Sequence, residues 1–158
     1  MLDANELIPL ARQIAVSNGL NDALVCAIIE QESAWNPEAT RYEPAFYQHY
    51  IVPLIASQDL SQGEATGRAT SWGLMQVMGQ VAREHGMAGP FQELLTPAVG
   101  IHWGCIVFAS KLKAASGDTY NALLRWNGGG NKEYPNQVTD RIDKYILPVM
   151  DVDLSTQV

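Results

Sequence analysis

The sequence predicts a single, mainly α-helical domain with a minor irregular or short β segment, spanning residues 1–158. Three observations support this prediction. Apolar residues recur every three or four positions through most of the chain, which is the spacing of a helix with one buried face. Residues that favour helix starts and stops, such as Asn, Asp, Pro and Gly, separate these stretches. The 158 residues are the size of one ordinary domain, and no repeat, linker or low-complexity segment divides them.

Two helices are expected at the N-terminal end. The sequence DANE has the form of a capping box, with Asp3 as N-cap and Glu6 reaching back, and helical spacing then continues to Gly19. Asn21 is suited to cap a second helix, which should end before Pro37 because proline disfavours helical backbone in the residue that precedes it. The apolar face of this second helix is formed by Leu24, Val25, Ile28 and Ile29.

The middle of the chain has weaker helical periodicity. Residues 39–67 are interpreted as a loop, a short aromatic helix that begins at Pro44, and a polar loop. Glycines bracket the apolar residues 73–79, which is typical of a turn or a short strand, and a short helix follows that ends at Gly86. This part supplies the irregular or β segment of the predicted fold.

Helices dominate again in the C-terminal part. Thr96 and Pro97 form a helix start in front of a long apolar stretch to about Ser116, which we expect to be the central buried helix. Asp118 caps a further helix, which the glycines at 128–130 end. A last helix before Pro148 is marked by Val138, Ile142 and Tyr145.

Composition and charge exclude several classes of protein. No apolar run approaches the ~18 residues that a membrane span needs, so no integral membrane segment is expected. The net charge of −7 argues against a protein that binds nucleic-acid phosphates. The N-terminal residues lack the basic start and the continuous apolar block of a secretory signal, so no signal peptide is expected. Cys26 and Cys105 lie in apolar helical sequence, which predicts buried reduced thiols rather than a disulfide.

One acid lies on an apolar helical face. Glu32 follows two isoleucines at helical spacings of three and four, so its side chain points toward the core. Glu30 is turned about 200° away and is expected to meet solvent. Burial raises the pKa of a carboxyl and keeps a proton available near neutrality, which a general acid requires. A buried ion pair with an arginine such as Arg41 or Arg125 would explain the position equally well, and the residues alone leave both interpretations open.

Four sequence blocks, in order, resemble the soluble lytic transglycosylases and their goose-type lysozyme relatives. ESAWNPEA at 32–39 resembles the Glu-Ser signature of that family, and SWGLMQV at 71–77 resembles its Ser-x-Gly-Leu-Met-Gln block. LLRWNGG at 123–129 resembles its Ala-x-x-x-Tyr-Asn-Gly block, with Trp126 in place of the usual tyrosine. The residues that resemble its closing pattern are Tyr134, Val138 and Tyr145.

The resemblance implies a lysozyme-like fold and cleavage of the β-1,4 bond between N-acetylmuramic acid and N-acetylglucosamine in peptidoglycan. Glu32 is then the acid that protonates the leaving oxygen. In the family mechanism the same residue returns as a base and takes the proton of the sugar's own 6-hydroxyl, which gives a 1,6-anhydro product without water. Neither a cofactor nor a metal is expected for this chemistry, and the partner is the peptidoglycan glycan strand.

The resemblance also implies which residues contact the sugar. The expected substrate-binding residues are Ser71, Gly73, Met75, Gln76, Trp126, Asn127, Tyr134, Glu43 and Tyr42. The amide of Gln76 can both donate and accept hydrogen bonds. Trp126 has no hydroxyl to offer to Glu32, and Tyr134 is expected to supply one instead. We expect Glu43 to bind a nearby arginine or a backbone amide and so to shape the wall of the cleft.

Two other functions stay open at this point. A hydrolytic muramidase would use Glu43 or Glu64 as a second carboxylate that activates water. A non-catalytic module that binds peptidoglycan or builds a phage tail would leave Glu32 unexplained, because a charge on an apolar face costs stability unless something uses or pairs it. RYEPAFY at 41–47 resembles a version of the domain common among phage-encoded members. It predicts a phage endolysin or virion-associated lysin, made in the host cytoplasm and acting on the cell wall, either as a monomer or as part of a virion.

Overall fold

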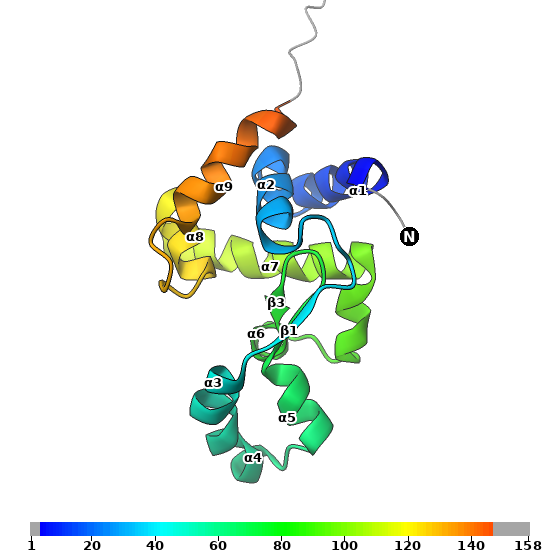
Figure 1. Cartoon of the computed structure of the whole chain (residues 1–158), viewed down its shortest axis with the longest axis vertical. Coiled ribbons are helices and arrows are strands. Elements are labelled where there is room, and N and C mark those ends of the chain that lie inside the picture. The colour runs from blue at the N-terminus through cyan, green and yellow to red at the C-terminus, as the bar shows by residue number, and fades with distance from the viewer. Residues whose placement is uncertain (1–3, 147–158) are drawn as a thin grey trace, which may run out of the picture.

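The structure is a computed structural model that describes residues 4–146. The predicted N-cap Asp3 and the proline at 148 lie outside the described residues. Figure 1 shows a larger group of helices in its upper part and a smaller group in its lower part. The upper helices are α1 (Ala4–Ser17), α2 (Asp22–Ser33), α7 (Pro97–Ala114), α8 (Thr119–Trp126) and α9 (Tyr134–Ile142), which the 3-10 helix η3 (Asp143–Tyr145) extends.

The long helix α7 runs through the middle of the molecule (Figure 1) and packs against α1 and α8, while α2 packs against α1 and α9. Every residue of α2 from 23 to 29 is buried, and α7 adds Ile101 and Phe108 to the same core. This confirms that α7 is the central buried helix. Cys26 and Cys105 are buried free thiols within this core, as predicted. Burial raises their pKa values, to about 11 for Cys26 and about 12 for Cys105.

Local sequence signals set the ends of these helices. The side chain of Asn21 accepts a hydrogen bond from the backbone N–H of Leu24 at 2.8 Å, and that of Asp118 accepts one from Asn121 at 2.9 Å. Both predicted N-caps are therefore confirmed. At the other end of α2, Ala34 and Trp35 have left-handed backbone, with φ of 49° and 66°. These two residues turn the chain away directly after the helix, so that Glu32 lies in its last turn.

A small antiparallel sheet lies below these helices in Figure 1, in the order β1, β2, β3. Its strands are β1 (Thr40–Tyr42), β2 (Thr70–Trp72) and β3 (Val77–Met78), followed by α6 (Gly79–Glu84) and the 3-10 helix η2 (Phe91–Leu95). In the register of the sheet, Arg41 of β1 lies opposite Ser71 of β2, and Ser71 lies opposite Met78 of β3. A mainly helical fold with a minor β segment is thus confirmed.

The lower group of helices corrects the interpretation of residues 39–67. It consists of α3 (Pro44–Phe46), a π-helical turn η1 (Tyr47–Ile51), α4 (Val52–Gln58) and α5 (Gln62–Arg68). The predicted polar loop is wrong, because helices α4 and α5 occupy that segment. Their small separate core centres on Ile51, Ala65 and Ala69. Two alanines give too little apolar contrast to reveal a buried helical face.

A signal for α5 was nevertheless present in the sequence. The side chain of Ser61 accepts a hydrogen bond from the backbone N–H of Glu64 at 3.2 Å. Ser-Gln-Gly-Glu, with a serine three residues before a glutamate, is the pattern of a capping box. Glu64 does not reach back to the cap, because its carboxylate binds Arg68 at 2.8 Å and Arg83 at 2.8 Å, which holds α5 to α6.

The C-terminal helices cover one side of α2 through a polar cluster. Glu30 accepts hydrogen bonds from Lys144 and from the hydroxyl of Tyr145, both at 2.6 Å, and Trp35 donates its indole N–H to the same hydroxyl at 3.0 Å. Burial acts to raise the pKa of Glu30, but the bonds from Lys144 and Tyr145 outweigh it and hold the pKa below its ordinary value. The expectation that Glu30 is a solvated surface acid is therefore wrong. Spacing within one helix does not show which other helix will cover it.

Gly73 begins the tight turn between β2 and β3. Its φ is +68°, and a Cβ at this position would lie 2.2 Å from the backbone oxygen of Leu94. We therefore predict that Gly73→Ala lowers the free energy of unfolding by about 2–3 kcal/mol, measured by urea denaturation. The control is Gly130→Ala, since nothing lies within 4 Å of that position. Its effect should stay within about 0.5 kcal/mol, and an equally small effect at Gly73 would contradict the prediction.

Candidate active site

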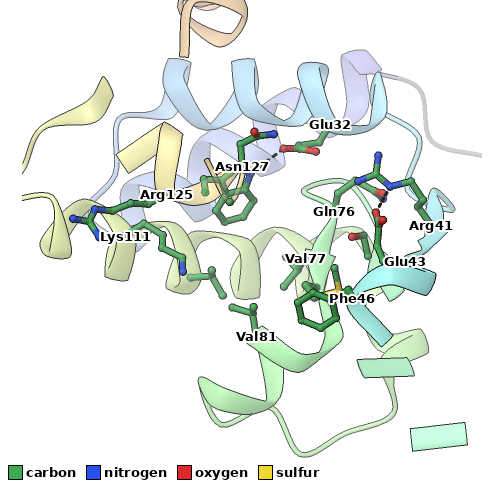
Figure 2. A pocket seen from close by; sticks show the side chains of 15 residues that line it. Glu32, Arg41, Glu43, Phe46, Gln76, Val77, Val81, Lys111, Arg125 and Asn127 are labelled. Carbon is green, nitrogen blue, oxygen red and sulfur yellow. Dashed lines mark hydrogen bonds and ion pairs between the residues drawn. The ribbon is translucent and has the colours of Figure 1, made fainter. Parts of the chain in front are cut away.

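A cleft of about 420 Å³ lies where the end of α2, the sheet, and helices α6, α7 and α8 meet. Figure 2 shows it from close by, with Glu32 on α2 along its upper edge and Val77 and Val81 along its lower edge. Arg41 and Glu43 lie at one end of the view, and Lys111 and Arg125 lie at the other. The cleft therefore has an apolar floor and charged groups at both ends.

The last turn of α2 is fixed to the sheet. The hydroxyl of Ser33 lies 2.8 Å from the backbone oxygen of Leu74 and 3.1 Å from that of Ile29, so it bridges α2 and the β2–β3 turn. This gives the serine next to Glu32 a structural role. Any change in the turn would therefore be transmitted to the position of the Glu32 carboxyl.

Two donors from distant parts of the chain converge on one oxygen of Glu32. The indole N–H of Trp126, at the end of α8, donates to Oε1 at 2.9 Å. The hydroxyl of Tyr134, at the start of α9, donates to the same atom at 2.5 Å. Tyr134 thus supplies the expected hydroxyl, and the indole adds a second donor that sequence reasoning did not foresee. The Trp126 ring also packs edge-on against Phe108, with centroids 5.8 Å apart, which fixes its orientation.

The surroundings of Glu32 favour its protonated form. Burial raises the pKa of this carboxyl; the hydrogen bonds from Tyr134 and Trp126 and the positive charge of Arg41 oppose the shift, but the pKa stays above its ordinary value. No arginine within residues 4–146 forms an ion pair with Glu32, so the paired-acid alternative is not what the structure contains. Because both donors bind Oε1, and no side chain in residues 4–146 hydrogen-bonds to Oε2, Oε2 is the oxygen left to carry a proton.

Glu43 lines the same cleft but is engaged by a cation. Its carboxylate forms an ion pair with Arg41 of β1, drawn as a dashed line in Figure 2. Its backbone N–H donates to Ala69 at 2.8 Å, and its backbone oxygen accepts from Tyr47 at 2.9 Å. The arginine partner expected for Glu43 is thus present, and the residue joins β1 to the lower group of helices.

Gln76 closes the β2–β3 turn with left-handed backbone, at φ of 47°. Its side-chain amide donates two hydrogen bonds, both at 2.9 Å, to the backbone oxygens of Ala39 and Gly73. Both N–H groups are therefore used within the protein, and the amide oxygen alone is left to accept a hydrogen bond from a ligand. Ser71 is buried on β2 and also lines the cleft.

The other expected substrate-binding residues are distributed between cleft, core and surface. Asn127 lines the cleft, and its side-chain oxygen accepts a hydrogen bond from the backbone of the following loop at 2.9 Å. Met75 is fully buried in the core, Gly73 is buried in its turn, and neither lines the cleft. Tyr134 is buried behind Glu32. Tyr42 is 46% exposed on β1 and packs against Tyr47 outside the cleft lining.

Several lining residues were not among the expected substrate-binding residues. Val107 and Lys111 line the cleft from α7, and Arg125 lines it from α8. The four-residue spacing between Val107 and Lys111 puts both on one face of α7, which is the signal that would have found the pair. The apolar floor is formed by β3 and α6. No local sequence pattern indicates that these two elements pack beneath Glu32.

Other candidate sites find no support in the described part of the chain. Glu64 does not line the cleft, and the hydrogen bond from Arg83, helped by Arg68, holds its pKa below the ordinary value despite partial burial. No group of three or more His, Cys, Asp or Glu side chains suited to a metal ion occurs within residues 4–146. In the same residues, no helix is long and apolar enough to cross a membrane.

The raised pKa of Glu32 makes the stability of the fold depend on pH. A carboxyl whose pKa is higher in the folded than in the unfolded protein stabilises the fold at low pH, and this contribution is lost as the pH rises through the folded pKa. Glu32→Gln keeps the shape of the neutral acid, so it should melt at a higher temperature than the wild type near pH 7. The difference should vanish below about pH 4, where the acid is protonated in both states. A variant that melts lower than the wild type near pH 7 would contradict this account.

The chain matches the model of the transglycosylase SLT domain over residues 9–145. Membrane-bound lytic murein transglycosylase C of Actinobacillus pleuropneumoniae serotype 5b is 37% identical over 57 residues, which are 36% of this chain and 16% of that protein. Proteins of the same name from Glaesserella parasuis serovar 5 and Haemophilus ducreyi are 37% and 35% identical over equal lengths. The matched segment is thus less than one fifth of these relatives. No solved structure matches the chain significantly.

The match to the family model covers the end of α2, the sheet and helices α7 to α9, and so includes every element that surrounds Glu32. The four blocks noted in the sequence fall in the same range. The chain therefore belongs to the transglycosylase SLT domain family.

Proposed function

We propose that the protein is a peptidoglycan lytic transglycosylase that cleaves the β-1,4 bond between N-acetylmuramic acid and N-acetylglucosamine, with Glu32 as the acid and then the base. Its family and the names of its relatives, lytic murein transglycosylases, support this class of reaction. The observation that carries the proposal is the asymmetric carboxyl of Glu32, with one oxygen bound by two donors and a raised pKa.

In the first step Glu32 protonates the oxygen that leaves. The bond between C1 of muramic acid and that oxygen breaks, and the oxygen takes the proton from Oε2. Trp126 and Tyr134 keep their bonds to Oε1, so they stabilise the carboxylate that forms without having to reorganise. Burial raises the pKa of Glu32 above its ordinary value, which favours the protonated carboxyl that a general acid needs.

In the second step the new carboxylate takes the proton of the muramic acid 6-hydroxyl while that oxygen bonds to C1. The product is a 1,6-anhydro sugar, no water is consumed, and Glu32 is protonated again for the next cycle. The 6-hydroxyl is tethered to the reacting carbon, which gives it an effective concentration that free water does not reach. One carboxyl is therefore sufficient for both steps.

One observation favours a second candidate, a hydrolytic muramidase. Glu43 is a second carboxylate in the lining of the same cleft, as the base of a hydrolase would have to be. Its ion pair with Arg41 speaks for a structural role, because a carboxylate engaged by a guanidinium is less available to activate water. In a module that only binds the wall, a desolvated acid would cost stability without serving any reaction.

The site of action follows from the substrate. We infer that the chain acts on the bacterial cell wall, and that it is a phage endolysin or virion-associated lysin. The RYEPAFY segment supports the phage origin, because it resembles phage-encoded members; it forms the end of β1 and the start of the lower group of helices. The residues around Glu32 fit wall cleavage in either setting.

Matched variants of the two cleft acids test the assignment. Glu32→Gln cannot deliver a proton, so its rate of cell-wall clearing should fall by about 10²–10⁴-fold with the fold intact. Glu43→Gln should lose much less activity but should melt at a lower temperature, because the ion pair with Arg41 is lost. Clearing is measured as turbidity loss of purified walls, and folding by circular dichroism. Equal kinetic losses with unchanged stability would make Glu43 a second catalytic carboxylate.

A further inference from the structure

The cleft continues beyond Glu32 into a second hollow. This hollow, of about 580 Å³, is lined by residues of α7, α8 and the loop that follows α8. It shares Lys111, Arg125 and Gly128 with the lining of the cleft that holds Glu32. The two hollows are therefore parts of one groove. Figure 2 shows Lys111 and Arg125 on the side of the cleft away from Arg41.

The two cations at this junction have no acidic partner in the described chain. The protein has ten Lys and Arg residues, all within residues 4–146. Those that form ion pairs are Arg12, Arg41, Arg68, Arg83, Arg141 and Lys144. Neither Lys111 nor Arg125 pairs or hydrogen-bonds with any side chain of residues 4–146. In a chain of net charge −7, such a pair makes the groove locally positive.

Helix electrostatics accounts for part of this arrangement. Lys111 lies in the last turn of α7 and Arg125 in the last turn of α8, where a cation is favoured by the helix dipole. That preference does not explain why the groove is lined by these two cations. Lys113 lies in the same last turn of α7, is also unpaired within residues 4–146, and lines neither hollow. Position in the groove therefore separates Lys111 from an otherwise equivalent lysine.

We propose that Lys111 and Arg125 bind a carboxylate of the peptide stem of peptidoglycan, so that the enzyme prefers peptide-bearing over bare glycan. This inference rests on the proposed function. The N-acetylated sugars of the backbone are uncharged, whereas the stem attached to muramic acid carries free carboxylates close to the bond that is cut. The planar guanidinium and the ammonium provide strong charge-assisted hydrogen bonds to an oxyanion. A wall polymer with phosphate groups has similar chemistry, and the experiment distinguishes it.

Binding of a stem carboxylate by Lys111 and Arg125 would strengthen the binding of substrate without changing the rate of the chemical step. The carboxylate takes no part in the bond changes, so its binding energy is the same before and in the transition state. Removal of the two cations should therefore raise KM and leave kcat unchanged. Added salt should weaken the preference for peptide-bearing strands, because the charges lie at the rim of an open groove.

The test compares two double variants of equal charge. Lys111→Gln with Arg125→Gln removes the proposed site. Lys113→Gln with Lys132→Gln removes two cations that line neither hollow and that form no ion pair within residues 4–146. Each pair changes the net charge from −7 to −9, since −7 − 2 = −9. The substrates are soluble glycan strands from a wall without phosphate polymers, either with stems or after an amidase has removed them.

We expect the wild type and the control to favour peptide-bearing strands. The groove variant should lose about tenfold in kcat/KM on those strands, through KM, and should lose much less on bare strands. Equal loss on both substrates, or a wild type indifferent to the stem, would overturn the proposal. Tighter binding of a soluble phosphate polymer than of peptide-bearing strands would also overturn it and assign the groove to phosphate.

Binding to the Glu32→Gln protein separates this proposal from the proposed function. If that protein binds peptide-bearing strands in preference to bare ones, and the preference disappears when Lys111 and Arg125 are also replaced, the anion site stands even if the wild type cleaves neither strand. If the wild type cleaves both strands and the Glu32→Gln protein binds both equally, the activity stands and the anion site is wrong.

Discussion

The structure depends on one carboxyl oxygen that accepts two hydrogen bonds. Oε1 of Glu32 is bound by Trp126 and Tyr134, which follow it in the sequence by 94 and 102 positions. The two donors arrive from separate helices, so α8 and α9 must both reach the end of α2 for the site to exist. This arrangement fixes one oxygen within the protein and leaves the other without a side-chain hydrogen bond in residues 4–146. The proposed chemistry rests on this asymmetry of a single side chain.

Much of the fold outside the cleft serves to hold that geometry. Glu30, on the far side of the same turn of α2, binds Lys144 and Tyr145 and so anchors the segment that follows Tyr134. Arg12 of α1 extends the cluster, because it donates to the backbone oxygen of Tyr145 at 2.5 Å and pairs with an acid of α2. The two acids of one helix turn therefore have opposite environments. The pKa of Glu30 is lowered, against burial, by the hydrogen bonds from Lys144 and Tyr145, and the pKa of Glu32 is raised by burial in the cleft.

Sequence reasoning succeeded where the controlling signal is local. The caps at Asn21 and Asp118, and the placement of Glu32 on an apolar face, follow from neighbours within one helical turn. It failed where the signal depends on a distant partner. The small core around Ala65 has too few large apolar residues to mark its helices, and the role of Glu30 is set by a segment more than a hundred residues away. The family resemblance brought Gln76 into the site but did not show that its two donors are already used.

If Glu32 alone performs both proton transfers, the ends of the released fragments will show it. In the measurement, the wild-type protein digests purified peptidoglycan, and mass spectrometry compares its fragments with those from a known muramidase. We expect mainly 1,6-anhydro ends, about 18 mass units lighter than hydrolysed ends because no water is added. Mostly reducing, unmodified muramic acid ends would contradict it and would assign a water-activating role to a second carboxylate in the cleft.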